Sequence, residues 1–447
     1  MGELFGTDGI RGVANEYPIT PEMALRVGRA TAYIFKRKRR KTRIIIGRDT
    51  RISGCMLQHA LVSGICSMGV HAFCAGVLPT PGVAFLARSM RLDAGIVISA
   101  SHNPFCDNGI KIFKGNGVKP SDEMELEVER LILEDKMPMA SEGRLGTSQH
   151  ITDARGRYVT FLKHVVSKDE TLEGLNMILD CANGATFQTA PATFRELGAT
   201  VKALFVDPDG CNINLNCGSE HPERLAEDVV RAKADVGFAF DGDGDRVTAI
   251  DEKGNILTGD QMLCICAKVM KDRGRLANNV VVSTVMSNIG LELALKELGI
   301  EHVTTQVGDK YVLQEMLARG GCIGGEGSGH MIFLDHHTTG DGIITALKVI
   351  SCMNRAGSPL SELARVMKVF PQRLINVEVK DKPRIEKVPD IVAAVEHVEN
   401  ALVDRGRVLV RYSGTQPMCR VMVEGPTHEE TEKYCSRIAE VVREKLG

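Results

Sequence analysis

Three acidic residues follow a strongly apolar run near the middle of the chain. Asp241, Asp243 and Asp245 alternate with glycines directly after the run at 236–240. Carboxylate oxygens are the ligands that a hard cation such as Mg²⁺ prefers, and the glycines let the backbone fold around an ion. Without an ion, three carboxylates this close would repel one another. The pattern predicts a Mg²⁺ site at the end of a buried strand.

Two other kinds of protein share part of this acidic pattern. An EF-hand loop would match at several positions, including Glu252 at the twelfth, but Arg246 stands where that loop needs glycine. Residues 246–251 also read as a strand, where an EF-hand needs a helix. Phosphatases of the haloacid dehalogenase type place two aspartates after a strand, and Asp241 would then be the nucleophile. The acidic motif alone leaves that alternative open.

A serine and a histidine follow a second buried strand, expected over 94–100. The loop reads Ser-Ala-Ser-His-Asn-Pro and places Ser101 beside His102. A serine hydroxyl is a poor nucleophile until a base or a metal assists it. Taken alone, the loop is more simply a turn that ends a strand. A Ser-His-Asp hydrolase is disfavoured because the G-x-S-x-G signature is missing and adjacent residues suit a triad poorly.

Two later loops combine glycines with polar side chains. Residues 324–330 offer Glu326, Ser328 and His330, and the glutamate could accept hydrogen bonds from two sugar hydroxyls. A plain glycine turn has equal weight there. Residues 411–417 offer an arginine, two hydroxyls and free backbone N–H groups between two strands, which are expected over 407–412 and 420–424. That composition favours a phosphate cradle over an ordinary hairpin.

The elements that position these loops predict an α/β fold. Apolar strands alternate with helices in three successive rounds, which indicates three similar α/β units with mixed sheets. A smaller α+β unit follows. The expected domains are 1–153, 154–253, 254–368 and 369–447. Because ligands bind beyond the carboxyl ends of strands in such sheets, the four loops are expected to converge on a central cleft.

Composition narrows the cellular context. The net charge of −2 excludes a general attraction for nucleic acid or anionic membranes. The 13 cysteines contain no C-x-x-C pair, which predicts reduced thiols in a cytoplasmic protein. Neither a signal peptide nor a membrane-spanning run is expected. Thr20-Pro21-Glu22 predicts the start of a helix, and the basic run 36–41 is interpreted as the other end of that helix, whose charges complement the helix dipole.

Six motifs in one order resemble the α-D-phosphohexomutase superfamily over almost the whole chain. They are F-G-T-D-G-I-R-G at 5–12, S-A-S-H-N-P at 99–104, N-G-I-K at 108–111, D-G-D-G-D-R at 241–246, G-E-x-S-G-H at 325–330 and R-Y-S-G-T-x-P at 411–417. Residues 307–309 and 333–342 look most like the branch that acts on glucosamine phosphates.

The resemblance implies a role for each motif. Ser101 would be a phosphoserine, and its phosphate would hold one Mg²⁺ per subunit together with Asp241, Asp243 and Asp245. The sugar loop would be Glu326, Ser328 and His330. The site for the non-reacting phosphate would be Arg411, Ser413, Gly414 and Thr415. Lys111 and Arg11 would lie near the transferring group.

The implied reaction moves a phosphoryl group between O6 and O1 of glucosamine through a 1,6-bisphosphate, which feeds UDP-N-acetylglucosamine and peptidoglycan synthesis. Lys111, with a pKa lowered by a closed site, is the expected general acid/base, and His330 is the alternative. Arg11 would stabilise charge. A kinase or self-phosphorylation would load Ser101, and a homodimer is expected.

Some positions depart from the superfamily pattern. Gln416, Lys310 and Gly327 replace a usual glutamate, arginine and larger residue. A phosphomannomutase or phosphoglucomutase therefore remains an alternative. A non-catalytic sugar-phosphate-binding protein would not need Ser101 or the acidic triplet, so their presence argues against it.

Overall fold

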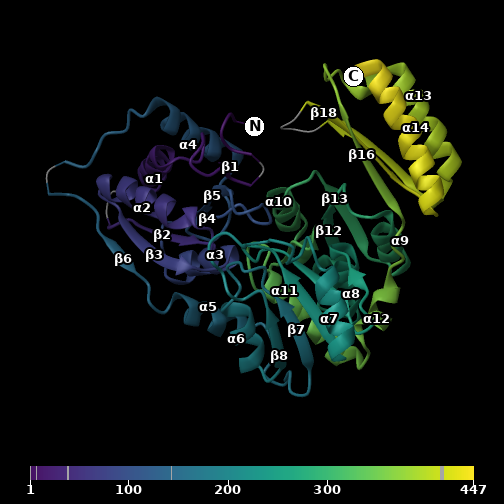
Figure 1. Cartoon of the computed structure of the whole chain (residues 1–447), viewed down its shortest axis with the longest axis horizontal. Coiled ribbons are helices and arrows are strands. Elements are labelled where there is room, and N and C mark those ends of the chain that lie inside the picture. The colour runs from purple at the N-terminus through teal and green to yellow at the C-terminus, as the bar shows by residue number, and fades with distance from the viewer. Residues whose placement is uncertain (1, 7, 38–39, 142, 413–416) are drawn as a thin grey trace. The chain divides into compact units, whose positions relative to one another are not determined.

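The computed structural model describes residues 2–6, 8–37, 40–141, 143–412 and 417–447 (Figure 1). The chain forms two compact units. The larger unit contains Met1–Val285 and Glu301–Arg365, and the smaller contains Met286–Ile300 and Val366–Gly447. Three mixed sheets belong to the larger unit and a three-stranded sheet to the smaller. The predicted class of three α/β domains and a smaller α+β domain is confirmed, and the domain limits stay predictions.

The first sheet has six strands in the order β1-β5-β4-β2-β3-β6. Its strands are β1 (Ile10–Val13), β2 (Arg43–Arg48), β3 (His71–Val77), β4 (Ala94–Ile98), β5 (Asp107–Lys114) and β6 (Ser148–His150). Its helices are α1 (Pro21–Phe35), α2 (Ser53–Ser67), α3 (Thr80–Ser89) and α4 (Asp122–Glu134). Every residue of β4 is buried. Since β4 pairs with β5 antiparallel, the chain turns sharply between them, and Ser101 lies in that turn.

The second sheet has the order β11-β10-β9-β7-β8. Its strands are β7 (Asn176–Asp180), β8 (Thr200–Leu204), β9 (Val236–Phe240), β10 (Val247–Asp251) and β11 (Ile256–Leu257), and its helices are α5 (Ala154–Lys163), α6 (Thr189–Glu196) and α7 (Glu223–Ala232). The acidic loop joins β9 to the antiparallel β10. The strand β10 confirms that this loop is not an EF-hand.

The third sheet has the order β13-β12-β14-β15. Its strands are β12 (Val280–Thr284), β13 (Glu301–Thr305), β14 (Ile323–Gly325) and β15 (Met331–Phe333). Its helices are α8 (Gly259–Asp272), α10 (Asp309–Arg319), α11 (Gly342–Ala356) and the short α12 (Leu360–Leu363), with 3₁₀ turns at Ala277–Asn279 and Ala364–Val366. A capping box of Thr258 and Gln261 starts α8. The predicted sugar loop joins β14 to β15.

The smaller unit is a three-stranded antiparallel sheet with helices. Its strands are β16 (Gln372–Glu378), β17 (Arg407–Tyr412) and β18 (Met418–Glu424), in the order β16-β18-β17. Its helices are α9 (Ile289–Glu297), α13 (Pro389–Leu402) and α14 (His428–Leu446), with 3₁₀ turns at Ile385–Lys387 and Val403–Arg405. The carboxylate of the fully buried Glu424 accepts a hydrogen bond from the backbone N–H of Ile289 at 2.9 Å. This contact ties α9, which lies between β12 and β13 in sequence, to the C-terminal sheet.

The basic run at 36–41 does not act as the sequence suggested. Helix α1 begins as predicted, with Thr20 as N-cap, but it ends at Phe35 with no basic residue in its last turn. Arg37 and Arg40 instead pair with the buried carboxylate of Asp93, at 3.2 and 2.6 Å. A buried carboxylate such as that of Asp93 requires positively charged partners. The ion pairs with Asp93, and not an interaction with the helix dipole, therefore determine where the two arginines lie. In the part of the chain described, no helix is long and apolar enough to cross a bilayer.

Candidate active site

Ser101 lies in a buried, strained turn against the acidic loop. Its φ is +52°. This left-handed backbone conformation is unfavourable for any residue that has a Cβ atom. Its side chain donates a hydrogen bond from Oγ to Asp241 Oδ2 at 2.5 Å, and His102 Nδ1 lies 3.4 Å from Oγ. The structure therefore brings together two motifs that are 140 residues apart in sequence.

A buried arginine holds the Ser101 turn in this conformation. Arg51 is fully buried, and its Nη2 donates to the carbonyl oxygens of Ser101 at 3.0 Å and Asn103 at 2.8 Å. Its Nε pairs with Asp49 Oδ2 at 2.9 Å. The same Asp49 oxygen accepts from Ser99 Oγ at 2.5 Å, and Ser99 Oγ accepts from the N–H of Ser101 at 3.0 Å. Both the N–H and the carbonyl oxygen of Ser101 are thus hydrogen-bonded.

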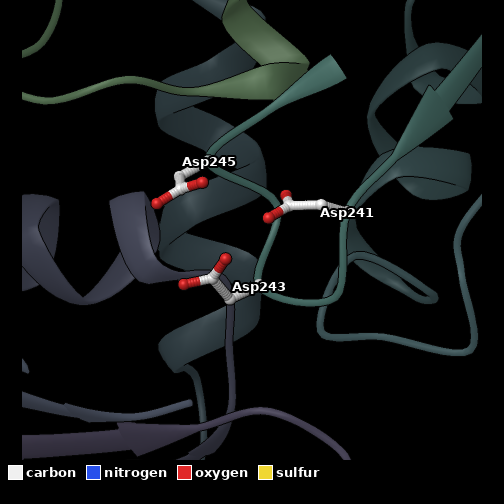
Figure 2. Close-up of side chains that lie close together, drawn as sticks. All are labelled: Asp241, Asp243 and Asp245. Carbon is white, nitrogen blue, oxygen red and sulfur yellow. The ribbon is translucent and has the colours of Figure 1, made fainter. Parts of the chain in front are cut away.

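The acidic triplet has the donor set of a divalent metal site. Asp241, Asp243 and Asp245 are buried, and one carboxylate oxygen from each lies within 4.8 Å of the others. Figure 2 shows the three carboxylates directed toward a common space. Asp243 Oδ1 is buried without a hydrogen-bond partner among the described residues. Three buried carboxylates with an unused oxygen fit a hard cation such as Mg²⁺.

Glycines in the acidic loop allow it to approach the serine turn. A Cβ atom on Gly242 would lie 2.5 Å from the carbonyl oxygen of Ser101, and Gly244 has a φ of +73°. Burial, together with the charges of Asp245 and Asp243, raises the pKa of Asp241 well above its usual value. The crowding of negative charge that the sequence suggested is therefore present, and a cation would relieve it.

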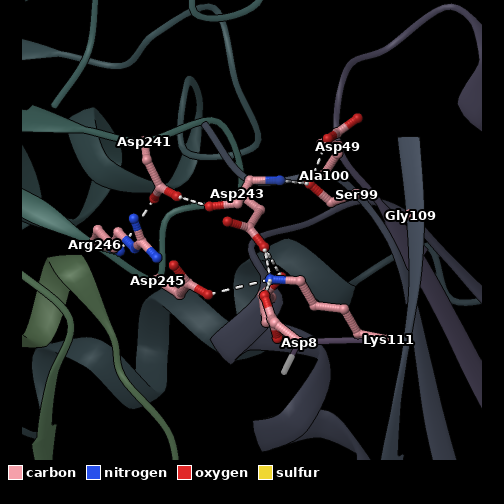
Figure 3. Close-up of polar contacts among 12 residues, drawn as sticks. Asp8, Asp49, Ser99, Ala100, Gly109, Lys111, Asp241, Asp243, Asp245 and Arg246 are labelled. Atoms are coloured by element: carbon pink, nitrogen blue, oxygen red, sulfur yellow. Dashed lines mark hydrogen bonds and ion pairs between the residues drawn. The ribbon is translucent and has the colours of Figure 1, made fainter. Parts of the chain in front are cut away.

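Lys111 lies on β5 and reaches the same carboxylates. Its Nζ is 2.8 Å from Asp8 Oδ2 and Asp243 Oδ2, and 3.3 Å from Asp245 Oδ2 (Figure 3). Burial alone would lower the pKa of Lys111, but these three carboxylates outweigh it and raise the pKa well above its usual value. The sequence-based expectation of a lowered pKa is wrong, because three nearby negative charges favour the ammonium form.

Charged groups of alternating sign continue from Lys111 around the site. Asp8 also pairs with Lys119 at 2.6 Å, and Lys119 pairs with Asp309 at 2.8 Å. His330 Nε2 lies 3.5 Å from Asp309 Oδ2, and its Nδ1 lies 3.7 Å from Asp245 Oδ1. Burial opposes protonation of His330, but Asp245 and Asp309 raise its pKa. The first, second and third α/β sheets therefore contribute to one connected set of charges.

Arg11 also belongs to this set. Its guanidinium forms an ion pair with Asp8, and Nη1 donates to the carbonyl oxygen of Ala100 at 3.4 Å. It therefore contacts the residue before Ser101. Burial would lower the pKa of Arg11, and the charges of Asp8 and Asp243 raise it, so the side chain is a permanent cation.

The predicted sugar loop is held by its own backbone. The N–H of Glu326 donates to the carbonyl oxygen of His330 at 2.9 Å, and Glu326 Oε1 accepts from the N–H of Gly308 at 3.1 Å. Ser328 is exposed, whereas His330 is buried. The loop thus directs His330 toward the charged residues and leaves Ser328 accessible to a ligand.

The predicted phosphate loop belongs to the smaller unit. Ser413, Gly414 and Thr415 lie outside the described residues, as does Gln416. Arg411 on β17 lies directly opposite Arg420 on the neighbouring antiparallel strand β18. Burial and the charge of Arg420 lower the pKa of Arg411. Two arginines side by side repel each other unless an anion lies between them, so this arrangement is suited to phosphate.

Sequence reasoning missed several residues of the site. Asp8 lies inside a motif that was recognised, but nothing beside it in sequence indicates its pairing with Lys111 and Lys119. Arg51 and Asn214 contact the serine turn, and Asn214 Nδ2 donates to the carbonyl oxygen of Ser101 at 2.9 Å. Arg246, at the end of the acidic motif, lies 3.2 Å from His102 Nδ1. The recognised motifs offered a signal for Asp8 and Arg246, which are among their residues, but none for Arg51 and Asn214.

Comparison with known protein families accounts for most of the chain. The family models of phosphoglucomutase/phosphomannomutase match in order: alpha/beta/alpha domain I at residues 2–139, domain II at 156–254, domain III at 258–370 and the C-terminal domain at 374–441. A phosphoglucosamine mutase of Syntrophus aciditrophicus is 64% identical over 100% of both chains. Another, from Syntrophobacter fumaroxidans, is 57% identical over 100% of both chains.

Solved structures share the fold at low sequence identity. A phosphoglucomutase/phosphomannomutase family protein from Burkholderia thailandensis matches with a TM-score of 0.80 at 23% identity, covering 99% of this chain and 98% of that one. An N-acetylphosphoglucosamine mutase from Aspergillus fumigatus, solved with GlcNAc-6P and magnesium, matches with a TM-score of 0.70 at 17% identity, covering 100% and 96%. The chain therefore belongs to the phosphoglucomutase/phosphomannomutase family, in the group of the phosphoglucosamine mutases.

Proposed function

We propose that this enzyme interconverts glucosamine 6-phosphate and glucosamine 1-phosphate through a phosphoserine at Ser101. The observation that carries the proposal is the 2.5 Å hydrogen bond between Ser101 Oγ and Asp241, which places a serine with a strained backbone beside the acidic triplet. The 64% identity to a phosphoglucosamine mutase supports the amino sugar as substrate. The product would supply the synthesis of UDP-N-acetylglucosamine and of peptidoglycan precursors.

The reaction consists of two phosphoryl transfers. In the first, the bond between phosphorus and Ser101 Oγ breaks and a bond from phosphorus to sugar O1 forms. The O1 hydroxyl loses its proton, and Oγ gains one. Glucosamine 1,6-bisphosphate then turns in the site. In the second, the bond from phosphorus to O6 breaks, the phosphoryl group returns to Oγ, and the serine proton passes to O6. Catalysis is mainly positioning and neutralisation of charge.

The chain's own residues divide the work. Asp241, Asp243 and Asp245 would hold Mg²⁺, which when bound neutralises negative charge on the transferring phosphoryl group. Arg11 contributes a permanent positive charge beside Ala100. Lys111 holds its proton in the resting site, so it is our candidate to give a proton to the departing Oγ and recover one from the sugar hydroxyl, with His330 as the alternative.

Substrate binding would use the predicted sugar loop and the predicted phosphate loop. Glu326 and Ser328 would bind sugar hydroxyls, and Arg411, Ser413, Gly414 and Thr415 the non-reacting phosphate. The facing arginines Arg411 and Arg420 support the phosphate assignment, because among the described residues neither forms an ion pair with a carboxylate. Lys310, one of the departures from the superfamily pattern, pairs with Asp122 and with Glu125 at 3.0 Å. A structural ion pair explains this lysine without a change of substrate.

Three further features are proposed with the function. Ser101 is loaded with its first phosphoryl group by a kinase or by self-phosphorylation. The enzyme acts as a homodimer. Its 13 cysteines, all free thiols, are those of a cytoplasmic protein.

A substrate comparison tests the proposal. Purified enzyme with Mg²⁺ and a trace of sugar 1,6-bisphosphate is given glucosamine, glucose or mannose 6-phosphate, and the 1-phosphate product is measured. We expect the highest kcat/KM for glucosamine. A preference for glucose or mannose would keep the mechanism and overturn the substrate.

The identity of the phosphorylated residue separates the mutase from a phosphatase. After incubation with ³²P-labelled bisphosphate, the label is expected on Ser101, as an acid-stable and base-labile ester. Ser101→Ala should abolish turnover while its circular dichroism is unchanged. Label on Asp241 together with release of free phosphate would favour the phosphatase that uses an aspartate.

A further inference from the structure

A cavity of about 330 Å³ lies in the larger unit, apart from the Ser101 site. Its walls come from residues 164–167 after α5, the second half of α8 with the turn after it, Cys322 before β14, the end of β15 with the residues that follow it, and α11. None of the residues assigned above to catalysis or to sugar binding lines it. The volume is at the lower end of the range for sites that bind small organic ligands.

The cavity is lined by more positive than negative charge. Arg273, Arg275, Lys348 and Arg355 line it, and Asp335 is its only carboxylate. Arg355 is neutralised by an ion pair with Glu170. Arg273 and Arg275 form no ion pair within the described ranges, and both are exposed. Only Gly274 separates Arg273 from Arg275 in sequence, so their two guanidinium groups can bind the oxygens of one anion.

Lys348 lies on the inner wall, and no described carboxylate forms an ion pair with it. It is half-buried, and Nζ donates to the carbonyl oxygen of Val165 at 3.3 Å. Burial, with the nearby charge of Arg355, lowers its pKa. Burial and the charge of Lys348 likewise lower the pKa of His336 to about 4. Burial is the larger cause of both shifts, and the charges of Glu170 and Asp335 oppose them.

The remaining walls are apolar or weakly polar. Valine, methionine and phenylalanine side chains are contributed by Val165, Val166, Val269, Met270 and Phe333. Thiols are contributed by Cys266, Cys322 and Cys352. An inorganic anion would leave these walls uncovered, whereas a phosphate ester would place its phosphate on the cations and its organic part against them.

We propose that this cavity binds a small phosphate monoester, with its phosphate on Arg273, Arg275 and Lys348. The phosphate dianion would neutralise these three positive charges, and each arginine can donate paired N–H hydrogen bonds to the phosphate oxygens. An ester the size of a triose or hexose phosphate matches the volume. Binding here does not depend on the reaction catalysed at Ser101.

The two helices that form the cavity also contact the catalytic loops at their other ends. At the start of α8, the N–H of Gly259 donates to the carbonyl oxygen of Gly327 in the sugar loop at 3.0 Å. At the start of α11, the N–H of Gly342 donates to the carbonyl oxygen of Gly244 in the acidic loop at 3.0 Å. A ligand that shifts α8 would therefore change the geometry of the sugar loop, and one that shifts α11 would change that of the acidic loop.

Calorimetric titration with glycerol 3-phosphate tests the site. The wild-type enzyme is compared with the double variant Arg273→Ser/Arg275→Ser, whose exposed positions leave the core intact. The matched control is Arg88→Ser/Lys233→Ser, which removes two exposed cations elsewhere in the larger unit. We expect the cavity variant to lose one binding equivalent or to bind it at least tenfold more weakly, while the control matches the wild type.

Two outcomes would overturn the proposal. One is a cavity variant that keeps the stoichiometry and affinity of the wild type. The other is an equal loss in the control, which would indicate only a general effect of charge. Lys348→Met provides an independent check, because it removes the inner cation without altering the exposed arginines, and it should weaken the same binding event. The kcat of all variants, measured without added glycerol 3-phosphate, is expected to match the wild type.

Discussion

Arg51 Nη2 donates a hydrogen bond at 3.0 Å to the carbonyl oxygen of Ser101, a residue whose φ is +52°. Arg51 is fully buried and also contacts Asp49 and the carbonyl oxygen of Asn103. A strained conformation persists only where its surroundings hold it. The arginine therefore fixes the direction of the nucleophile without contacting a reacting atom, which makes it a positioning residue.

Arg51→Lys tests this relationship, because it keeps the charge opposite Asp49 but cannot make the several directed hydrogen bonds of a guanidinium. We expect kcat to fall by roughly 10- to 100-fold, because a displacement of about 1 Å at a reacting group has an effect of this size. KM should change little, since the side-chain contacts of Arg51 are with Asp49 and the serine turn. Arg43→Ala, on the strand β2 that precedes Arg51, is the control. A variant with unchanged kcat would remove the positioning role.

Mg²⁺ should stabilise the folded enzyme through the acidic triplet. An ion that binds only the native state adds about 2.7 kcal/mol at a free concentration of 100 times its Kd. The Tm measured by calorimetry should therefore rise with Mg²⁺ and return to its starting value with EDTA. Asp245→Asn should lose most of this rise, whereas Asp272→Asn, at an exposed end of α8, should keep it. An equal rise in both variants would place the ion elsewhere.

Glu129 anchors the N-terminal segment that leads to Asp8. Its carboxylate accepts hydrogen bonds from the N–H groups of Glu3, Leu4 and Phe5, at 2.6, 2.9 and 3.2 Å. Glu129→Gln weakens these charge-assisted bonds and should lower the free energy of unfolding by about 2 kcal/mol in urea. Amide exchange at residues 3–5 should accelerate. Glu127→Gln, on the exposed side of α4, should leave both unchanged, and equal effects in the two variants would contradict the anchor.

His337 should make stability depend on pH. Its Nε2–H donates to the carbonyl oxygen of Pro81 and its Nδ1 accepts from the N–H of Thr338, both at 2.8 Å, so the ring is neutral. Burial lowers its pKa from 6.5 to about 4. Because the unfolded chain binds the proton more readily, stability falls as the pH decreases from 6.5 to about 4, by up to about 3 kcal/mol.

His337→Asn isolates this contribution, since the amide oxygen can still accept from Thr338. Urea unfolding at intervals from pH 7 to pH 4 should show a shallower decline in the variant than in the wild type. Stability curves that stay parallel across this range would assign the pH dependence to other groups. His336, with a similarly lowered pKa, is present in both proteins and cancels in the comparison.

Local patterns in the sequence were sufficient to predict most elements and the identity of the chemical loops. The apolar run before the acidic motif is β9, Thr20-Pro21-Glu22 starts α1, and β17 has the predicted limits. Each of these depends on neighbours along the chain: a period of side-chain burial, a cap, or a glycine at a turn. The spacing of carboxylates in the acidic motif is likewise local, so the sequence alone indicated a metal site.

Only the tertiary structure decided how those groups act on one another. The pKa of Lys111 rises because Asp8, Asp243 and Asp245 arrive from distant segments, and the basic run after α1 pairs with Asp93 for the same reason. Arg51 and Asn214 carry no motif that marks them as partners of Ser101. Electrostatic interactions depend on distance in space and on burial, neither of which adjacent residues reveal. The sequence determined which groups are available, and packing determined their charge and direction.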